Sequence, residues 1–369
     1  MKLYIIAGEA SGDLHGSNLA KELMNVDPTI EMRGWGGELM ESNGVTIVKH
    51  YRDLAFMGFV EVILNLRTIA KNFHFCKEDI VKYSPDAVVL IDYPGFNLRI
   101  AAWCKKHSIP VFYYISPQIW AWKQGRVKNI KRDVTRMFTI LPFEKEFYAR
   151  FDVEVEFVGH PLLDIIPENN YIDSIPNTNP LIALLPGSRK QEIRTMLPLM
   201  LEEVRDLGCD YIIAGAPGQD LSFYTSIEGV EANKIVFGRT YEIFQKAHAG
   251  MVTSGTATLE AALFGLPQVV CYKGSRISYN IAKKLIKIKY ISLVNLIMNS
   301  PVVVELIQDS FNKENLHHEL KKLISDGKYR QEIRTSYSQL RAQLGGPGAS
   351  ERTAKLMLTT LSELIQYKK

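Results

Sequence analysis

The sequence of 369 residues contains little cysteine and no strong excess of charge of either sign. Its four cysteines form no CxxC pair, and their spacing suits neither a zinc cage nor a disulfide framework, which favours a reducing cytoplasmic environment. The 44 Lys and Arg residues outnumber the 40 Asp and Glu residues by only 4, so charge does not indicate nucleic acid as a partner. No window of about 18 residues lacks polar and charged groups, which argues against a membrane-spanning helix.

Several motifs that mark well-known sites do not occur in the sequence. There is no GxGxxG fingerprint for dinucleotides, no GxxxxGK[ST] loop for phosphates, and no HExxH or HxH arrangement for zinc. We therefore expect no metal site and no bound cofactor. The apolar stretch at residues 3–7 is only as long as a strand and is followed by Glu9 and Asp13, so we do not expect a signal peptide.

Short apolar runs alternate with longer amphipathic segments along the whole chain. Runs such as AVVLI at 87–91 and VFYYI at 111–115 are apolar on both sides, which is typical of buried parallel strands. Longer patterns at 11–26 and 60–83 indicate helices. The alternation predicts a doubly wound α/β fold. We expect strands at residues 3–7, 87–91, 111–115, 136–140, 181–185, 211–214, 235–237, 250–253 and 268–271.

A break in this pattern divides the chain. Residues 166–180 hold three prolines and four asparagines with little apolar content, which predicts a linker. Two Rossmann-like domains would then span residues 1–165 and 181–345, with the active site in the cleft where their strand ends face each other. A last helix at 346–369 could pack on the first domain or on a partner subunit of a homodimer.

Two carboxylates of the first domain follow predicted strands. Glu9 precedes a helix for which Ser11 would be the cap and Asp13 a favourable charge near the positive end of the helix dipole. Glu9 itself either contacts substrate or belongs to that helix start. Asp92 ends the strand at 87–91, where partial burial would raise its basicity. The alternative for Asp92 is an Asx-turn residue before Pro94.

The second domain begins with a candidate anion site. The stretch LPGSR at 185–189 joins a strand to a helix, and Ser188 with Gln191 fits a capping box. Arg189 in the first helical turn opposes the helix dipole, which an anion bound there would offset. The alternative is that the positive side chains are simply solvated.

Small residues begin a second helix in the same domain. Ser254, Gly255 and Thr256 would expose backbone N–H groups to a phosphate, and Glu260 lies one turn further on the same face. A carboxylate in that position can accept hydrogen bonds from a ribose diol. The alternative is an acid that only interacts with the helix dipole.

Two segments suggest contact with lipid. On a helix, residues 54–72 would present one narrow polar stripe, and the rest of the surface would be apolar, with Phe56, Met57, Phe59 and Ile63 as membrane candidates. Such a helix is either buried in the protein or dips into a membrane.

The second segment combines tryptophans with positive charge. Residues 123–136 hold six basic side chains and one acid, and they follow two tryptophans directly. They could bind a phospholipid surface, a phosphorylated acceptor or nucleic acid, or form a solvated basic face. The candidates are Trp120, Trp122, Lys123 and Arg126.

Eight stretches, taken in order, carry a resemblance over nearly the whole chain. They are GEASGDLHG, LAFMGFVEV, IDYPGFN, SPQIWAWKQGR, LPFEKEFY, FVGHPL, LPGSR and SGTATLEAALFGLP. Together they resemble the bacterial lipid-A-disaccharide synthases, glycosyltransferases with two Rossmann-like domains (GT-B). The resemblance implies inverting transfer of 2,3-diacylglucosamine from UDP-2,3-diacylglucosamine to 2,3-diacylglucosamine 1-phosphate, with UDP leaving. It also implies peripheral association with the inner face of the inner membrane.

The same resemblance assigns roles to residues. Asp92 would be the base for the acceptor 6-hydroxyl, Glu9 a second cleft carboxylate, and Asn295 a contact of the nucleotide. Arg189 and the helix starts at 188 and 254–256 would stabilise the leaving diphosphate without a metal. Many family members carry Asp where this chain has Gly95, so a second acid near Asp92 is missing.

Two other classes of protein remain as alternatives. One is a UDP-sugar epimerase of similar architecture, and the other is a non-catalytic module that binds a nucleotide sugar or an anionic lipid. An epimerase would need no lipid-facing surface, and a binding module would need no carboxylates at the cleft. UDP release with and without the acylated acceptor would separate the three.

Overall fold

Strands and helices alternate as the apolar runs predict, and all paired strands are parallel. The computed structural model describes residues 1–54, 66–167, 179–274 and 288–366. The chain divides into two units, Met1–Asp164 with Leu344–Lys369, and Ile165–Gln343. Most of the predicted linker, residues 168–178, lies outside the described residues, as do Phe56, Met57, Phe59 and Ile63.

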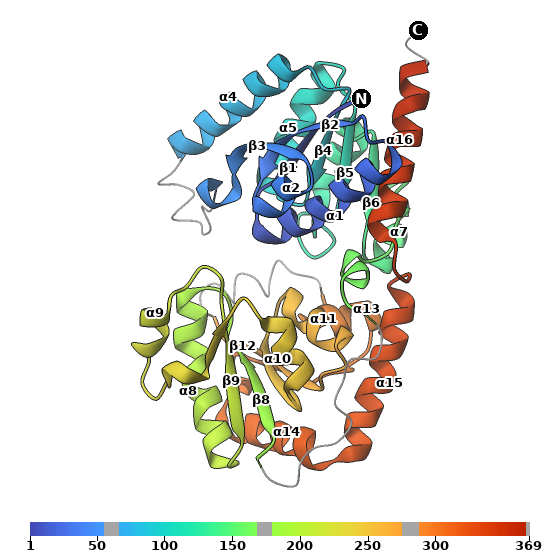
Figure 1. Ribbon diagram of the computed structural model, residues 1–369. Helices are drawn as coiled ribbons and strands as arrows, with labels where there is room; N and C mark the ends of the chain where they lie inside the picture. The colour runs from blue at the N-terminus through green and yellow to red at the C-terminus, as the bar shows by residue number, and fades with distance from the viewer. Residues whose placement is uncertain (55–65, 168–178, 275–287, 367–369) are drawn as a thin grey trace. The chain divides into compact units, whose positions relative to one another are not determined.

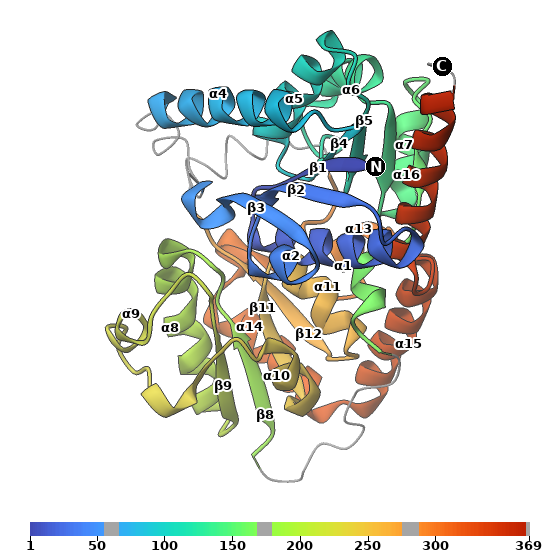
Figure 2. The same ribbon diagram turned by 45° about the horizontal axis from the view of Figure 1, so that its top comes forward.

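Unit 1 contains a seven-stranded sheet with the strand order β3-β2-β1-β4-β5-β6-β7. Its central strands β1 and β4 are almost fully buried because helices cover both faces. Figure 2 shows α4, α5 and α6 on one face and α1 and α2 on the other. The strands are β1 (Lys2–Ala7), β2 (Glu31–Gly36), β3 (Val45–His50), β4 (Ala87–Ile91), β5 (Val111–Tyr114), β6 (Arg136–Thr139) and β7 (Glu156–Phe157). The helices are α1 (Ala10–Val26), α2 (Glu38–Ser42), α4 (Leu66–Tyr83), α5 (Pro94–Lys106), α6 (Val127–Asp133), α7 (Pro142–Ala149) and α16 (Ala349–Gln366).

Unit 2 repeats this design with a six-stranded sheet of order β10-β9-β8-β11-β12-β13 (Figure 1). The strands are β8 (Leu181–Leu185), β9 (Asp210–Gly215), β10 (Ile235–Phe237), β11 (Ala249–Thr253), β12 (Gln268–Tyr272) and β13 (Glu305–Ile307). The helices are α8 (Lys190–Asp206), α9 (Leu221–Thr225), α10 (Thr240–Lys246), α11 (Thr256–Leu263), α13 (Leu293–Met298), α14 (Lys313–Ser325) and α15 (Gly327–Gln343). Both units therefore have the predicted Rossmann-like topology.

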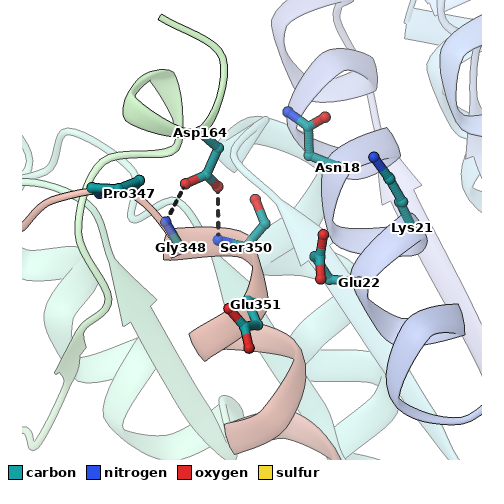
Figure 3. Close-up of a pocket in the computed structure, with 8 residues that line it drawn as sticks. All are labelled: Asn18, Lys21, Glu22, Asp164, Pro347, Gly348, Ser350 and Glu351. Atoms are coloured by element: carbon teal, nitrogen blue, oxygen red, sulfur yellow. Dashed lines mark hydrogen bonds between the residues drawn. The ribbon is translucent and has the colours of Figure 1, made fainter. Parts of the chain in front are cut away.

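The last helix, α16, packs against α1 of the same chain. Asp164 fixes its start, since the carboxylate accepts hydrogen bonds from the backbone N–H groups of Gly348, Ala349 and Ser350 at 2.6, 3.1 and 3.0 Å (Figure 3). A shallow pocket of about 240 Å³ lies at this junction, and none of the predicted site residues lines it.

No helix in the described part of the chain is both long and apolar enough to cross a membrane. The helix expected at 60–83 is described from Leu66 onward as α4.

Candidate active site

Each sheet has one point where the order of strands reverses, and four of the predicted site segments, at Glu9, Asp92, Arg189 and 254–256, follow the strands that border these two points. In unit 1 the reversal lies between the paired strands β1 and β4, which lead to Glu9 and Asp92. In unit 2 it lies between β8 and β11, which lead to Arg189 and to Ser254. Ligands of open parallel sheets bind outside the carboxyl ends of strands at such switch points.

Asp92 occupies a strained turn at the end of β4. Its φ angle is +43° and that of Tyr93 is +48°, so two successive residues with side chains are left-handed before α5 begins at Pro94. This conformation costs roughly 1–2 kcal/mol per residue. The ring of Tyr93 lies against Gly8, where a Cβ atom would fall 2.4 Å from the ring. Glycine is therefore required at position 8 if the Tyr93 ring keeps its place.

The carboxyl group of Asp92 is poised to hold a proton near neutral pH. Burial raises its pKa to about 7, the negative charge of Glu9 adds to the rise, and a hydrogen bond from the Tyr93 backbone partly opposes it. A general base works best when its pKa lies near the working pH. The geometry and electrostatics of Asp92 therefore suit proton abstraction.

Two buried side chains hold the backbone of Asp92, and the sequence analysis did not single them out for this. The hydroxyl of Tyr113 on β5 donates to the Asp92 carbonyl oxygen at 2.6 Å, and Nδ2 of Asn97 donates to the same oxygen at 2.8 Å. The sequence feature that could have pointed to Tyr113 is a tyrosine in a strand predicted to be buried on both faces, because a buried hydroxyl needs a hydrogen-bond partner.

The loop before α1 differs from the prediction in its capping. The helix begins at Ala10 with Glu9 as the flanking residue, so Ser11 lies inside the first turn and is not the cap. Asp13 lies in the first turn of α1, as expected, and its carboxylate accepts the N–H groups of Gly37, Leu39 and Met40 at the start of α2. Tertiary packing brings these donors to Asp13, so its carboxylate also caps α2 in addition to its predicted place in the first turn of α1.

The tryptophans after β5 separate into one buried and one exposed side chain. The expectation that Trp120 lies on a lipid-facing surface is wrong, because it is 8% exposed and its indole N–H donates to buried Glu144 at 3.2 Å. Trp122 is 44% exposed, with the Lys123 ammonium 4.1 Å from its ring centre.

Only part of the positive charge in the basic segment after these tryptophans is free of ion pairs with nearby carboxylates. Arg132 pairs with Asp133, Arg136 with Glu156, and Lys131 lies 3.9 Å from Asp152. The positive side chains near Trp122 that have no ion pair among the described residues are Lys123, Arg126 and Lys128.

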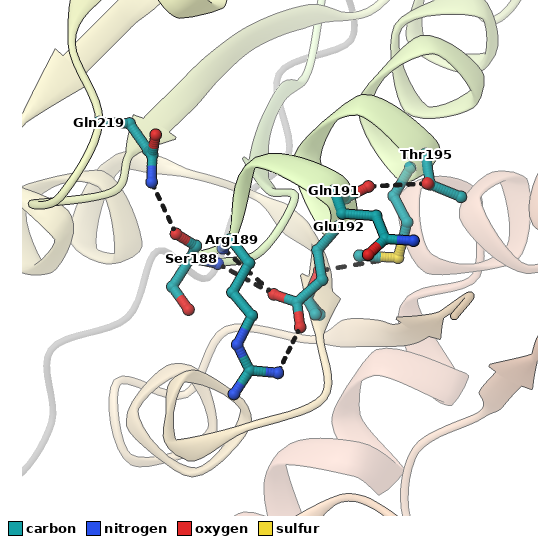
Figure 4. A network of polar contacts seen from close by, with 8 residues as sticks. Ser188, Arg189, Gln191, Glu192, Thr195 and Gln219 are labelled. Atoms are coloured by element: carbon teal, nitrogen blue, oxygen red, sulfur yellow. Dashed lines mark hydrogen bonds and ion pairs between the residues drawn. The ribbon is translucent and has the colours of Figure 1, made fainter. Parts of the chain in front are cut away.

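The first loop of unit 2 is organised by Glu192 (Figure 4). Its carboxylate accepts the backbone N–H groups of Ser188 and Arg189, both at 3.3 Å, and lies 3.3 Å from a guanidinium nitrogen of Arg189. The N-cap residue is thus Arg189, one position later than the predicted Ser188, and Glu192 accepts its backbone N–H; the other half of a capping box is absent because a guanidinium group cannot accept a hydrogen bond. The Arg189 side chain remains 66% exposed, so it can reach a ligand, whereas two of the loop amides already bind a carboxylate.

The loop that leads from β11 into α11 in unit 2, residues 254–256, is partly exposed to solvent. Gly255 and Thr256 are exposed, and no side chain of the described residues caps α11. The Ser254 hydroxyl donates to the carbonyl of Ile291 at 3.0 Å. Glu260 accepts the hydroxyl of Tyr241 at 3.1 Å; burial raises the pKa of Glu260, and this hydrogen bond partly opposes the rise.

Asn295 lies in the interior of unit 2. Its Nδ2 donates to the Val303 carbonyl at 2.8 Å and to Glu305 at 3.0 Å, and its Oδ1 accepts the Val303 N–H at 3.0 Å. With 1% exposure, Asn295 holds together the segment around β13, and its predicted contact with the nucleotide stays a prediction.

Comparison with known proteins connects both units to one family. The family model described as lipid-A-disaccharide synthetase matches residues 3–360. The lipid-A-disaccharide synthase of Syntrophus aciditrophicus is 40% identical over 374 aligned residues, covering 97% of each chain.

Solved structures resemble the whole chain at much lower sequence identity. The UDP-GlcNAc 2-epimerase of Methanocaldococcus jannaschii, solved with UDP-GlcNAc and UDP, has a TM-score of 0.64 at 13% identity, covering 97% of this chain and 100% of the other. The calicheamicin glycosyltransferase has a TM-score of 0.61 at 15% identity, with 97% and 98% covered. At such identities the likeness extends to the fold alone, which transferases and epimerases share.

Proposed function

The chain belongs to the lipid-A-disaccharide synthase family, and from this premise we propose that unit 1 deprotonates the acceptor while unit 2 holds the leaving nucleotide. The enzyme is a glycosyltransferase that forms the lipid A disaccharide. The family relationship does not favour the epimerase or the binding module. The observation that carries the division of roles is the contrast between Asp92, with its pKa near 7, and Arg189 at the other switch point.

Asp92 acts on the acceptor, 2,3-diacylglucosamine 1-phosphate. Its carboxylate takes the proton of the 6-hydroxyl as that oxygen forms a bond to the anomeric carbon of the donor. The bond from this carbon to the diphosphate of UDP-2,3-diacylglucosamine breaks, and UDP leaves with the electron pair. A single displacement inverts the anomeric centre and gives the β-1,6 linkage. Glu9 assists because its charge keeps Asp92 basic.

Unit 2 stabilises the charge that develops on UDP. Arg189 exchanges its contact with Glu192 for the diphosphate, and the exposed start of α11 at Gly255 and Thr256 offers backbone donors to the same group. Glu260 accepts from the ribose hydroxyls beside Tyr241. Ser188 and Ser254 shape these loops through backbone contacts.

The test is UDP release, measured with the acylated donor alone and with donor plus acceptor. We expect release that depends on the acceptor and a disaccharide product by mass spectrometry. An epimerase would change the donor without an acceptor, and a binding module would release no UDP. Either result would contradict the proposed reaction.

We also propose that unit 1 meets a phospholipid surface, where both acylated substrates reside. The support is the exposed ring of Trp122 with Lys123, Arg126 and Lys128 nearby in sequence, since interfacial tryptophan and cations favour anionic head groups. Phe56, Met57, Phe59 and Ile63, which lie outside the described residues, remain membrane candidates on their apolar sequence pattern alone.

Co-sedimentation with vesicles that contain anionic phospholipid tests this contact. Trp122→Ala with Lys123→Ala should release the protein, whereas Arg132→Ala, which removes a cation already paired with Asp133, should not. Equal binding by both variants would contradict a specific surface. Changing Phe56, Phe59 and Ile63 together to Ser should also weaken binding while the protein stays folded.

A further inference from the structure

The turn at Asp92 is held through the main chain of Asp92. The Asp92 N–H donates to the carbonyl of Tyr114 at 3.1 Å, and its own carbonyl oxygen accepts from Tyr113 and Asn97. Both donors are fully buried. The turn therefore has three main-chain anchors, although its left-handed angles are unfavourable for residues 92 and 93.

Asn97 connects this turn to the two central strands. Besides Asp92, its Nδ2 donates to the carbonyl of Ile91 at 3.2 Å and faces that of Ile6 at 3.5 Å. Its Oδ1 has no hydrogen-bond partner among the described residues. The side chain is thus oriented by carbonyl groups on β1 and β4, the strands that lead to Glu9 and Asp92.

We propose that Tyr113 and Asn97 are positioning residues, which hold the Asp92 carbonyl and so keep residues 92 and 93 left-handed, with the Asp92 carboxyl directed at the acceptor. The inference rests on the proposed role of Asp92 as the base. Strain at a functional residue persists only where its surroundings fix it. Without the two donors the turn relaxes, and the carboxyl group leaves its half-buried position near Glu9.

Tyr113→Phe is the first variant, because it removes one donor and leaves the ring in place. Tyr148→Phe is its matched control: Tyr148 is also fully buried in unit 1, and its hydroxyl forms a hydrogen bond of 2.8 Å with that of Ser116 and none with Asp92. Both variants should lower the melting temperature by similar amounts. Tyr113→Phe alone should lower kcat by about 10–100-fold, the range expected for a base displaced by about 1 Å.

The pH profile separates positioning from general loss of packing. In Tyr113→Phe the acidic limb of kcat should move to lower pH, because the carboxyl group becomes more exposed to water. In Tyr148→Phe the limb should stay in place, and both variants should bind UDP as the unchanged protein does. If Tyr113→Phe matches its control in kcat and in pH profile, the inference is wrong.

A second pair of variants tests the backbone directly. Tyr93→Gly and Tyr93→Ala both remove the ring, but only glycine accepts a positive φ without cost. The glycine variant should be the more active one, and its advantage should grow when Tyr113→Phe is also present. Equal activity of the two would overturn the inference even if Tyr113→Phe failed to fold.

The variant Asp92→Asn separates this inference from its premise. If Asp92→Asn is inactive while Tyr113→Phe has unchanged kcat, Asp92 remains the proposed base and the positioning role of Tyr113 is wrong. If Asp92→Asn keeps near-normal turnover, the proposed base itself is wrong.

Discussion

The two switch points share one topology and differ in charge. In unit 1, Asp92 and Glu9 are two acids at neighbouring strand ends, and burial with mutual repulsion lets Asp92 take up a proton near neutral pH. In unit 2, the carboxylate of Glu192 lies beside the guanidinium of Arg189, and that cation remains largely in solvent. The same arrangement of strands therefore carries the proposed proton acceptor in one unit and the proposed anion site in the other. Loop residues, and not strand order, determine the chemistry.

The contrast is tested most strongly by Asp92→Asn. This change keeps the side-chain shape and removes the proton acceptor, so turnover should fall by about 10²–10⁴-fold. UDP affinity should stay nearly unchanged, because the proposed diphosphate site lies in unit 2. Steady-state rates and UDP titration measure the two effects. If Asp92 were only an Asx-turn residue, the Asn variant would remain active.

The counterpart in unit 2 is Arg189→Ala. Loss of a charge-assisted contact of roughly 1.5–3 kcal/mol should weaken binding of the UDP-sugar by about 10–150-fold. Arg194→Ala is the control, since Arg194 lies on α8, the helix that begins after Arg189, and its guanidinium lies over the ring of Phe223 on α9. Unchanged kinetics in folded Arg189→Ala would contradict the diphosphate contact.

A pH profile compares the acids of unit 1 with each other. Asp92 must be deprotonated to act, and its pKa is raised to about 7, so kcat should increase with pH through this region. Glu9→Gln removes a negative charge that raises this pKa, and the acidic limb should therefore move to lower pH. A limb that stays in place would mean that Glu9 does not act on Asp92.

Asp164→Ala tests how the last helix is fixed to unit 1. Loss of the cap on α16 should lower the free energy of unfolding by about 0.5–2 kcal/mol in denaturant titration. Glu78→Ala, which removes an exposed carboxylate 3.0 Å from His74 on α4, should have little effect. Equal losses would argue against a capping role.

The smallest expected effect is that of EDTA, which should leave transfer unchanged. No group of three or more His, Cys, Asp or Glu side chains in the described part of the chain is arranged to hold a metal ion. The assay is UDP release before and after chelation. Loss of activity that magnesium restores would reveal a cation site.

Sequence patterns located the central strands well and the outer ones poorly. All nine predicted strands exist, but β2, β3, β7 and β13 were not predicted. Three of these four are edge strands, with only partly buried side chains, so their apolar pattern is weak. Burial on both faces gives β4 and β5 the continuous apolar runs that a sequence reveals.

The sequence by itself determined the alternation of strands and helices, the two Rossmann-like units, and the positions of Asp92 and Arg189 at strand ends. Those features depend on neighbours a few residues apart. Only the tertiary structure decided which groups surround these side chains. Asp13 caps a helix that begins at residue 38, Asp164 caps one that begins at residue 349, and Tyr113 holds the backbone of Asp92. Such partners come from distant parts of the chain, and the local periodicity of the sequence does not indicate them because it depends only on residues a few positions apart.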